Sequence, residues 1–343
     1  MKLASALTTT VALAALISGA SYAADMATPP DSAAVVEHID KAKKLAGNDL
    51  TVPMFLCRAD SGMMVRNAIE NDSGKWMEPT KLFDNIFWMG NRFVGVFAIK
   101  TSDGVILYDS GSSTDEIQNH IVPGLQKLGI DPKTIKYSII SHGHYDHFGG
   151  AAWLQKTYGV KIGLSAPDWD LVAATLLTAG REAPTRDVVI ADGQVFKLGD
   201  TSITFYVTPG HTPGALSAIL SGKEKGKTYT LSLLGSVAFP PNLDPTPQNG
   251  GLLLYDKSVQ RFADISKKAG AVGILNTHAF ADGGLQRLDA AAARKSDAAN
   301  PFLIGADAVN RYYGLFDECL KAAIARPHSA DDIGKPSVPP KRS

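Results

Sequence analysis

The sequence is poor in cysteine, has no excess of charge of either sign, and has no long apolar run after its first two dozen residues. Its two cysteines, Cys57 and Cys319, stand far along the chain from the dense histidine cluster, so cysteine ligation of a metal is not indicated. Basic and acidic residues number 34 each, and no long basic run occurs. Neither nucleic acid nor an anionic membrane surface is therefore indicated as a partner.

The first 24 residues have the pattern of a secretory signal peptide. Lys2 supplies a positive charge, the run from Leu3 to Ala20 is mostly apolar, and Ser21-Tyr22-Ala23 resembles a cleavage site. A transmembrane anchor is the alternative, but the run is short and an acidic, proline-containing stretch follows it. We therefore predict export to the periplasm, cleavage after Ala23 or Ala24, and no membrane association afterwards.

Export bears on what the two cysteines can do, because disulfides form and persist in oxidising compartments. A bridge between Cys57 and Cys319 would tie the two ends of the mature chain together, and two free buried thiols are the alternative. The sequence does not give the Cα separation that a bridge needs, so both readings stay open.

Composition and patterning predict a layered α/β domain. Hydrophobic residues make up 45% and charged residues 20% of the chain, an ordinary globular balance. We expect an N-terminal extension over 25–78, a domain over 79–326, and a disordered Pro- and Lys-rich tail over 327–343. In the extension, Val35–Leu45 predicts a short helix and Asn48–Ser73 an irregular segment.

Within the domain, strand patterns alternate with helix patterns, which indicates helices layered on sheets. We expect strands over 82–86, 87–89, 94–99, 105–108, 135–140, 160–164, 195–198, 202–207, 218–220, 229–234 and 273–276. We expect helices over 115–128 with a kink at Pro123, and over 149–158, 256–268 and 306–325.

The segment His142-Gly-His144-Tyr-Asp146-His147 carries three of the eight histidines of the chain. Imidazole nitrogens and a carboxylate are ligands that zinc prefers. Alternate spacing places His142, His144 and Asp146 on one side of an extended segment, and His147 follows around the corner. This arrangement can serve two adjacent metal ions.

Two further histidines follow apolar strands. His211 lies in the loop Thr208-Pro209-Gly210-His211-Thr212-Pro213-Gly214, whose prolines and glycines fix the backbone and allow close approach to a ligand. His278 follows Asn276-Thr277, and the loops after strands are where ligand sites collect. Alone, either would more often be structural, but the cluster needs further ligands to close two coordination spheres. His38, His120 and His328 lie in helical or tail segments and are expected to be solvated.

These motifs together resemble the metallo-β-lactamase superfamily, a group of hydrolases with an αβ/βα four-layer sandwich, over about residues 82–325. The resemblance implies a first zinc ion held by His142, His144 and His211. It implies a second held by Asp146, His147 and His278. It also implies that Asp109, at a strand end, braces the metal-binding loop.

One departure narrows the resemblance. Many hydrolases of the superfamily carry a bridging aspartate, and one β-lactamase subclass a cysteine, where Ser236 stands here. A serine there, with His147 as the additional ligand, is similar to the third subclass of metallo-β-lactamases, which are exported. Asn300-Pro301-Phe302 before a terminal helix agrees with that subclass. Two features depart from that subclass: Ala238 stands where a second serine is common, and the extension is longer than the resemblance predicts.

The resemblance implies a zinc-dependent hydrolase that opens the β-lactam ring of penicillins, cephalosporins or carbapenems, small-molecule substrates. A hydroxide generated between the metals would attack the carbonyl, with Asp146 as ligand and orienting group. Ser236 is a tentative substrate contact, and a buried hydroxyl bonded to protein is the alternative. Another hydrolase of the same fold, acting on a lactone, thioester, sulfate ester or phosphodiester, is the first alternative function. A non-catalytic periplasmic zinc-binding protein is the second, and a monomer is the default state.

Overall fold

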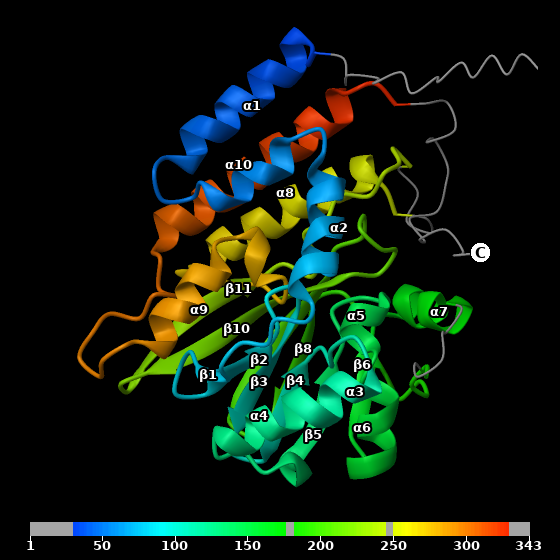
Figure 1. The fold of residues 1–343 in the computed structure, drawn as a ribbon, viewed down its shortest axis with the longest axis vertical. Coiled ribbons are helices and arrows are strands. Elements are labelled where there is room, and N and C mark those ends of the chain that lie inside the picture. The colour runs from blue at the N-terminus through cyan, green and yellow to red at the C-terminus, as the bar shows by residue number, and fades with distance from the viewer. Residues whose placement is uncertain (1–29, 176–181, 245–249, 329–343) are drawn as a thin grey trace, which may run out of the picture. The chain divides into compact units, whose positions relative to one another are not determined.

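Two β-sheets packed face to face, with helices outside each, make up the fold (Figure 1). The computed structural model describes residues 30–175, 182–244 and 250–328. The predicted signal peptide therefore lies outside the described residues, as does nearly all of the predicted tail. The order of layers is helix, sheet, sheet, helix, which confirms the predicted αβ/βα sandwich.

The first sheet has seven strands in the order β1-β2-β3-β4-β5-β6-β7. Its first four strands pair antiparallel, and β4 to β7 pair parallel, with helices in the crossovers. The strands are β1 (Thr80–Lys81), β2 (Ile86–Gly90), β3 (Gly95–Thr101), β4 (Gly104–Tyr108), β5 (Ile135–Ile139), β6 (Lys161–Leu164) and β7 (Val188–Val189).

The second sheet has five strands in the order β12-β11-β10-β9-β8. All neighbours pair antiparallel except β11 and β12, which are parallel. The strands are β8 (Gln194–Leu198), β9 (Thr201–Val207), β10 (Leu216–Glu224), β11 (Lys227–Leu233) and β12 (Gly273–Leu275).

Three apolar cores separate the layers. The central core joins the facing sides of the two sheets, with Phe97 and Tyr108 on one and Phe205 and Leu231 on the other. A second core lies between the seven-stranded sheet and its helices. That helix layer contains α3 (Thr114–Glu116), η2 (Ile117–Ile121), α4 (Val122–Lys127), α5 (Tyr145–Phe148), α6 (Ala151–Tyr158) and α7 (Ala166–Ala174).

The third core lies between the five-stranded sheet and the remaining helices, and α1 and α10 run side by side over it (Figure 1). The helices here are α1 (Ala33–Ala46), α8 (Leu252–Lys268) and α10 (Ala306–Ala325), with the turn η1 (Val52–Cys57) against α10. Three further short elements are α2 (Ser61–Asp72), η3 (Pro132–Thr134) and η4 (Ala279–Ala281), and α9 (Gly284–Ala292) closes the edge of the central core.

Most predicted elements are confirmed within a few residues, but the extension differs. The helix over Val35–Leu45 is confirmed as α1, whereas the irregular segment predicted over Asn48–Ser73 is wrong, because it contains η1 and α2. Their helical periodicity is weak in sequence, and tertiary packing of the segment supplies the missing stabilisation. Helices α7 and α9 were also missed. The predicted kink at Pro123 is a change from the wider turn η2 to α4.

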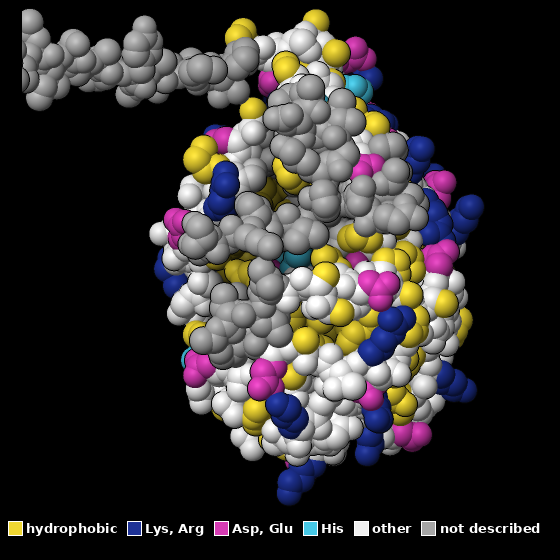
Figure 2. Space-filling model, turned by 90° about the vertical axis from the view of Figure 1, so that its right-hand side faces the viewer, with side chains coloured by type: hydrophobic (Ala, Val, Ile, Leu, Met, Phe, Trp, Pro, Cys, Tyr) yellow, Lys and Arg dark blue, Asp and Glu magenta, His cyan; other side chains and the backbone are white. Residues whose placement is uncertain are grey.

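Cys57 and Cys319 form a disulfide, which joins η1 to α10 across 262 residues of sequence. Of the two readings that the sequence left open, the bridge is therefore the one found. The face displayed in Figure 2 carries acidic and basic side chains interspersed with one another. Among the described residues, no helix combines the length and apolar character needed to cross a membrane.

Candidate metal centre

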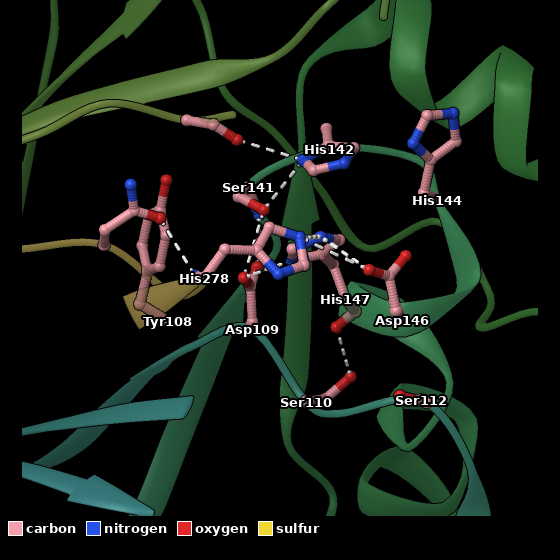
Figure 3. A network of polar contacts seen from close by, with 12 residues as sticks. Tyr108, Asp109, Ser110, Ser112, Ser141, His142, His144, Asp146, His147 and His278 are labelled. Carbon is pink, nitrogen blue, oxygen red and sulfur yellow. Dashed lines mark hydrogen bonds and ion pairs between the residues drawn. The ribbon is translucent and has the colours of Figure 1, made fainter. Parts of the chain in front are cut away.

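The histidine cluster lies where β5 ends and its chain turns into α5. His142 and His144 occupy the loop, and the first turn of α5 carries Asp146 and His147 (Figure 3). The segment is therefore extended, as predicted, only as far as His144. The short helix α5 then directs Asp146 and His147 to a different part of the site from His142. Strand β5 fixes this loop because it is central and its end is buried.

The two remaining histidines come from the other sheet. His211 lies in the loop between β9 and β10, where Gly210 has φ +148° and packs so tightly on Tyr255 that a Cβ atom would lie 2.2 Å from it. His278 follows β12. The loop ends of both sheets thus meet, and all six predicted ligands come together.

The six side chains form two groups of three. His142, His144 and His211 offer nitrogen atoms that all lie within 4.8 Å of one another. The same holds for Asp146, His147 and His278, which are buried. This grouping is the one that the resemblance implied, and metal binding by either group stays a prediction.

In the first group, two of the three rings donate from one nitrogen to a backbone carbonyl and have the other nitrogen left for a metal. His142 donates from Nδ1 to Gly235 O (3.0 Å), and its buried Nε2 has no partner. His211 donates from Nδ1 to Ala238 O (2.8 Å), so its Nε2 carries a lone pair, and this atom faces Nδ1 of His144 at 3.0 Å. Two nitrogen lone pairs at this distance require a cation or proton between them.

Burial lowers the pKa of all three imidazoles in this group, and that of His144 falls to about 4. Neighbouring imidazoles lower the pKa values of His142 and His211 further, because charged rings would repel one another. The rings are therefore neutral at pH 7, which is the form that binds zinc.

The second group shows the same facing nitrogens. His278 donates from Nδ1 to Phe93 O (2.9 Å), and its Nε2 lies 3.2 Å from Nε2 of His147. Oδ2 of Asp146 lies 3.3 Å from the His147 nitrogen and 3.4 Å from the His278 nitrogen. Three donor atoms thus converge on one point.

Charge in the second group favours a cation. Burial would lower the pKa of His147, but the carboxylates of Asp146 and Asp109 raise it to about 10. Burial would likewise raise the pKa of Asp146, and the charge and hydrogen bond of His147 hold it well below its usual range. The carboxylates that favour a proton on His147 would favour a divalent ion in the same place, and we expect metal binding to release a proton there.

Asp109 braces the loop, as the resemblance implied. Its Oδ2 accepts from His147 Nδ1 (2.6 Å), and its Oδ1 accepts from the Ser141 backbone N–H (2.6 Å), as Figure 3 shows. The Ser141 hydroxyl also reaches Asp109 Oδ2 (3.1 Å) and lies 3.1 Å from His142 Nδ1. Asp109 has φ +69°, an unusual backbone for a residue other than glycine, and the buried hydrogen bonds hold it there.

A second brace, Asp168, escaped sequence analysis. This fully buried carboxylate on α7 accepts from Gly143 N (2.8 Å), Thr212 Oγ1 (2.7 Å) and Gly214 N (2.7 Å). It thereby ties the His144 loop to the His211 loop, and burial raises its pKa to about 6. The capping pattern Ser165-Ala-Pro-Asp168 marks a helix start and was the one available signal.

Ser236, the tentative substrate contact, is 4% exposed. Its hydroxyl lies 3.0 Å from Tyr255 Oη, which itself donates to Ser236 O (2.6 Å). These bonds agree with the alternative of a buried hydroxyl bonded to protein, and the substrate role stays a prediction. Ser236 belongs to neither group of metal ligands.

Two histidines expected to be solvated have protein partners instead. His38 Nδ1 lies 2.7 Å from Glu318 Oε2, and the His120 ring stacks on Trp76 with centroids 3.8 Å apart. Both side chains are partly buried. The sequence did not predict this, because helical periodicity does not show which neighbour covers a side chain. His328 Nε2 donates to Ala323 O (3.0 Å). None of the three joins either metal group.

Comparison with known proteins agrees with this geometry. Residues 89–223 match the metallo-beta-lactamase superfamily model, which includes the histidine cluster and His211 but ends before His278. The structure is similar to that of BJP-1, a subclass B3 metallo-beta-lactamase of Bradyrhizobium japonicum (TM-score 0.61, 26% identity, 72% of this chain and 92% of that one).

Two curated relatives in sequence are named as other hydrolases. A probable polyketide biosynthesis zinc-dependent hydrolase, BaeB of Bacillus velezensis, is 27% identical over 39% of this chain and 52% of its own length. A hydroxyacylglutathione hydrolase of Acidiphilium cryptum is 31% identical over 29% of this chain and 37% of its own. The chain thus spans about half or less of the length of these two relatives.

Proposed function

We propose that this chain, which has the metallo-β-lactamase fold and resembles that superfamily in its ligand motifs, is a zinc hydrolase with two metal ions that opens β-lactam rings. The fold and the superfamily resemblance support a metal-dependent hydrolase acting on a small molecule. The β-lactam substrate, the number of zinc ions and export to the periplasm are parts of the proposal.

The observation that carries the choice of substrate is the composition of the second metal group. His147 completes this group together with Asp146 and His278. Where other members of the superfamily carry a bridging aspartate, this chain has Ser236, which is hydrogen-bonded to Tyr255. Each group then has three protein ligands, which leaves coordination positions open, as catalysis requires. This set is similar to that of the third β-lactamase subclass, and the structural similarity to BJP-1 supports the same choice.

Zinc ions in these groups would lower the pKa of a coordinated water to about 7 and polarise a substrate carbonyl. The chain's own residues orient the reaction. Asp146 is the one carboxylate among the six ligands, so it can accept a proton from the attacking water and hold its direction. Asp109 keeps the Nδ1 proton of His147, and the Gly235 and Ala238 carbonyls keep those of His142 and His211. Nε2 of each of these three rings then has a lone pair free for a metal ion.

A thioester hydrolase is the second candidate function. The sequence similarity to a hydroxyacylglutathione hydrolase, over part of each chain, supports it. The serine in place of a bridging aspartate argues against it. An open metal pair would serve either carbonyl, so the substrate alone separates the two candidates.

A substrate panel tests the proposal. The zinc-loaded protein is assayed with a penicillin, a cephalosporin, a carbapenem, an acylglutathione thioester, a lactone and a phosphodiester. We expect kcat/KM for at least one β-lactam to exceed that for every other class by about a hundredfold or more, about 2.7 kcal/mol of transition-state stabilisation. A preference for the thioester or another class contradicts the β-lactam assignment.

We also propose that the chain is exported. The Cys57–Cys319 disulfide supports this, because such bridges persist in oxidising compartments. Expression in a Gram-negative host followed by fractionation tests it. The mature protein, starting after Ala23 or Ala24 by mass, is expected in the periplasmic fraction, and an uncleaved chain in the cytoplasm contradicts it.

A further inference from the structure

His278 is held by a different part of the molecule from the first metal group. Its ring is 4.8 Å from that of Phe93, centroid to centroid, and it donates to the Phe93 carbonyl. Phe280, in η4 just after His278, lies 5.9 Å from Phe93 and 5.7 Å from the His278 ring. Two phenylalanines therefore pack around His278, the residue just before η4.

Residues 52–69 of the N-terminal segment cover this aromatic pair. Phe55 of η1 lies 6.0 Å from Phe280, centroid to centroid. From α2, Ala68 packs in one cluster with Phe93, and Val65 and Ile69 pack against that cluster together with Phe280. The segment thus supports the rings that support His278.

The same segment is fastened at one place by a covalent bond. Cys57 ends η1 two residues after Phe55, and its disulfide joins η1 to Cys319 of α10. Arg326 adds a hydrogen bond to the Cys57 carbonyl (2.6 Å) and an ion pair with Asp31 (2.9 Å). The weak helical periodicity of 48–73 means that packing and this bridge, and not local propensity, hold the segment.

The first metal group depends on the segment less directly. The partners of its rings and loops, Gly235, Ala238 and Asp168, lie outside residues 31–72. Leu56 and Cys57 reach the neighbourhood of the two carbonyls only through the core that they share with Leu234 and Val237. A change in the N-terminal segment should therefore affect the second metal site more strongly than the first.

We propose that residues 31–72, fastened by the Cys57–Cys319 disulfide, are a positioning device for His278, so that opening the disulfide weakens the second metal site more than the first. A dithiol reductant supplies two electrons and two protons to the disulfide and is itself oxidised to a disulfide, which leaves two thiols on the protein. The proposal rests on metal binding in the proposed function and is independent of the substrate.

The test measures zinc binding to the metal-free full chain at buffered free Zn²⁺, with bound zinc counted by atomic emission. Cobalt absorption spectra report the ligand set at each step. In the Cys57→Ser/Cys319→Ser variant we expect the second binding constant to fall about tenfold, the size of effect typical when a group that orients a metal ligand is lost. We expect the first constant to stay within about twofold, which also shows that the variant is folded.

Substitutions of Phe55 distinguish a loss of His278 positioning from a general destabilisation of the fold. Phe55→Ala in the oxidised protein should weaken the second site about tenfold, and Phe55→Leu should restore most of it. In the Cys57→Ser/Cys319→Ser variant, Phe55→Ala should weaken zinc binding at the second site by less than about a further twofold, because both changes act on His278 through the same segment. Ile265→Ala, a truncation in α8 against the same core but outside residues 31–72, is the matched control and should change neither constant.

Equal weakening of both sites, or no change at either, overturns the proposal. If the double-serine variant does not fold, the Phe55 pair and Ile265→Ala in the oxidised protein decide in the same way. A protein that binds two zinc ions with this pattern but hydrolyses no β-lactam overturns the proposed substrate and leaves this inference standing.

Discussion

At the scale of single residues, most of the ligand imidazoles are oriented by an acceptor on their other ring nitrogen. Carbonyls of Gly235, Ala238 and Phe93 and the carboxylate of Asp109 fill this role. Such partners fix the ring and its tautomer before a metal arrives. Variants of the groups around the ligands therefore test the site more selectively than variants of the ligands.

Asp168→Asn should weaken the first metal site. In the unchanged protein the Asp168 carboxylate accepts from backbone and hydroxyl donors. The asparagine amide would place its own N–H groups against these donors and leave buried donors without partners. We expect a loss of about 2–3 kcal/mol in unfolding free energy at pH 8 and about tenfold weaker first-site zinc binding. Urea unfolding and zinc titration measure both.

Asp170→Asn, an exposed change on the same helix, is the control for that variant. It should leave stability and zinc binding unchanged. If Asp168→Asn binds zinc at both sites as tightly as the unchanged protein, Asp168 is not a brace between the two loops.

Ser236→Ala and Tyr255→Phe should behave alike, since each removes a member of one buried hydroxyl pair. We expect each to cost about 1 kcal/mol of unfolding free energy and to leave KM for the preferred substrate within about twofold. Thermal unfolding and steady-state kinetics measure the two effects. A rise in KM confined to Ser236→Ala would instead support the substrate contact predicted from sequence.

At the scale of elements, two carboxylates face each other where α8 packs on α10. Burial and the hydrogen bond and charge of Asp317 raise the pKa of half-buried Asp256 to about 6. Gln260 donates to both carboxylates (3.1 and 3.0 Å), and Lys321 pairs with Asp317. This contact therefore gives the helix pair a pH dependence of its own.

The sign follows from the raised pKa of Asp256. The folded state keeps a proton that the unfolded chain has lost between about pH 4 and 6, so this contribution to stability is complete below about pH 4 and is lost as pH rises through 6. Asp256→Asn imitates the protonated form and should stabilise the protein by about 1 kcal/mol at pH 8, after allowance for solvent screening, and by much less at pH 4.5.

Chemical unfolding of both proteins at the two pH values measures this difference. Asp264→Asn, on an exposed face of the same helix, should show no such change with pH. A stabilisation by Asp256→Asn that is equal at both pH values would mean that the carboxyl pair is not its source.

At the scale of the whole molecule, the sequence predicted the layers and the grouping of the site residues better than the contacts that support them. Strand periodicity is a local signal, and the two sheets confirm it. The motif around His142 is local too, and its residues lie in the two candidate metal groups, whose binding of metal stays a prediction. Asp168 and the partners of His38 depend on contacts between segments far apart in sequence, which no local pattern reports. In the extension, η1 and α2 were missed for the same reason, because packing rather than propensity forms them.

Because both sheets supply ligands, metal binding should stabilise the entire domain. Zinc at about a hundred times its dissociation constant should add about 2.7 kcal/mol to the unfolding free energy and raise the melting temperature by several degrees. Differential scanning calorimetry with zinc and with a chelator measures the shift. A His211→Ala/His278→Ala variant, which removes one ligand from each group, should show almost none.

The central claim is that two zinc ions held by this chain open a β-lactam ring, and one rate measurement tests it most directly. Hydrolysis of a carbapenem and a cephalosporin by the zinc-loaded protein is followed before and after removal of metal with a chelator, and again after zinc is restored. The account predicts turnover with close to two zinc ions bound, its loss on chelation, and its recovery with zinc. Turnover that persists without metal, or none with both sites filled, would contradict the account.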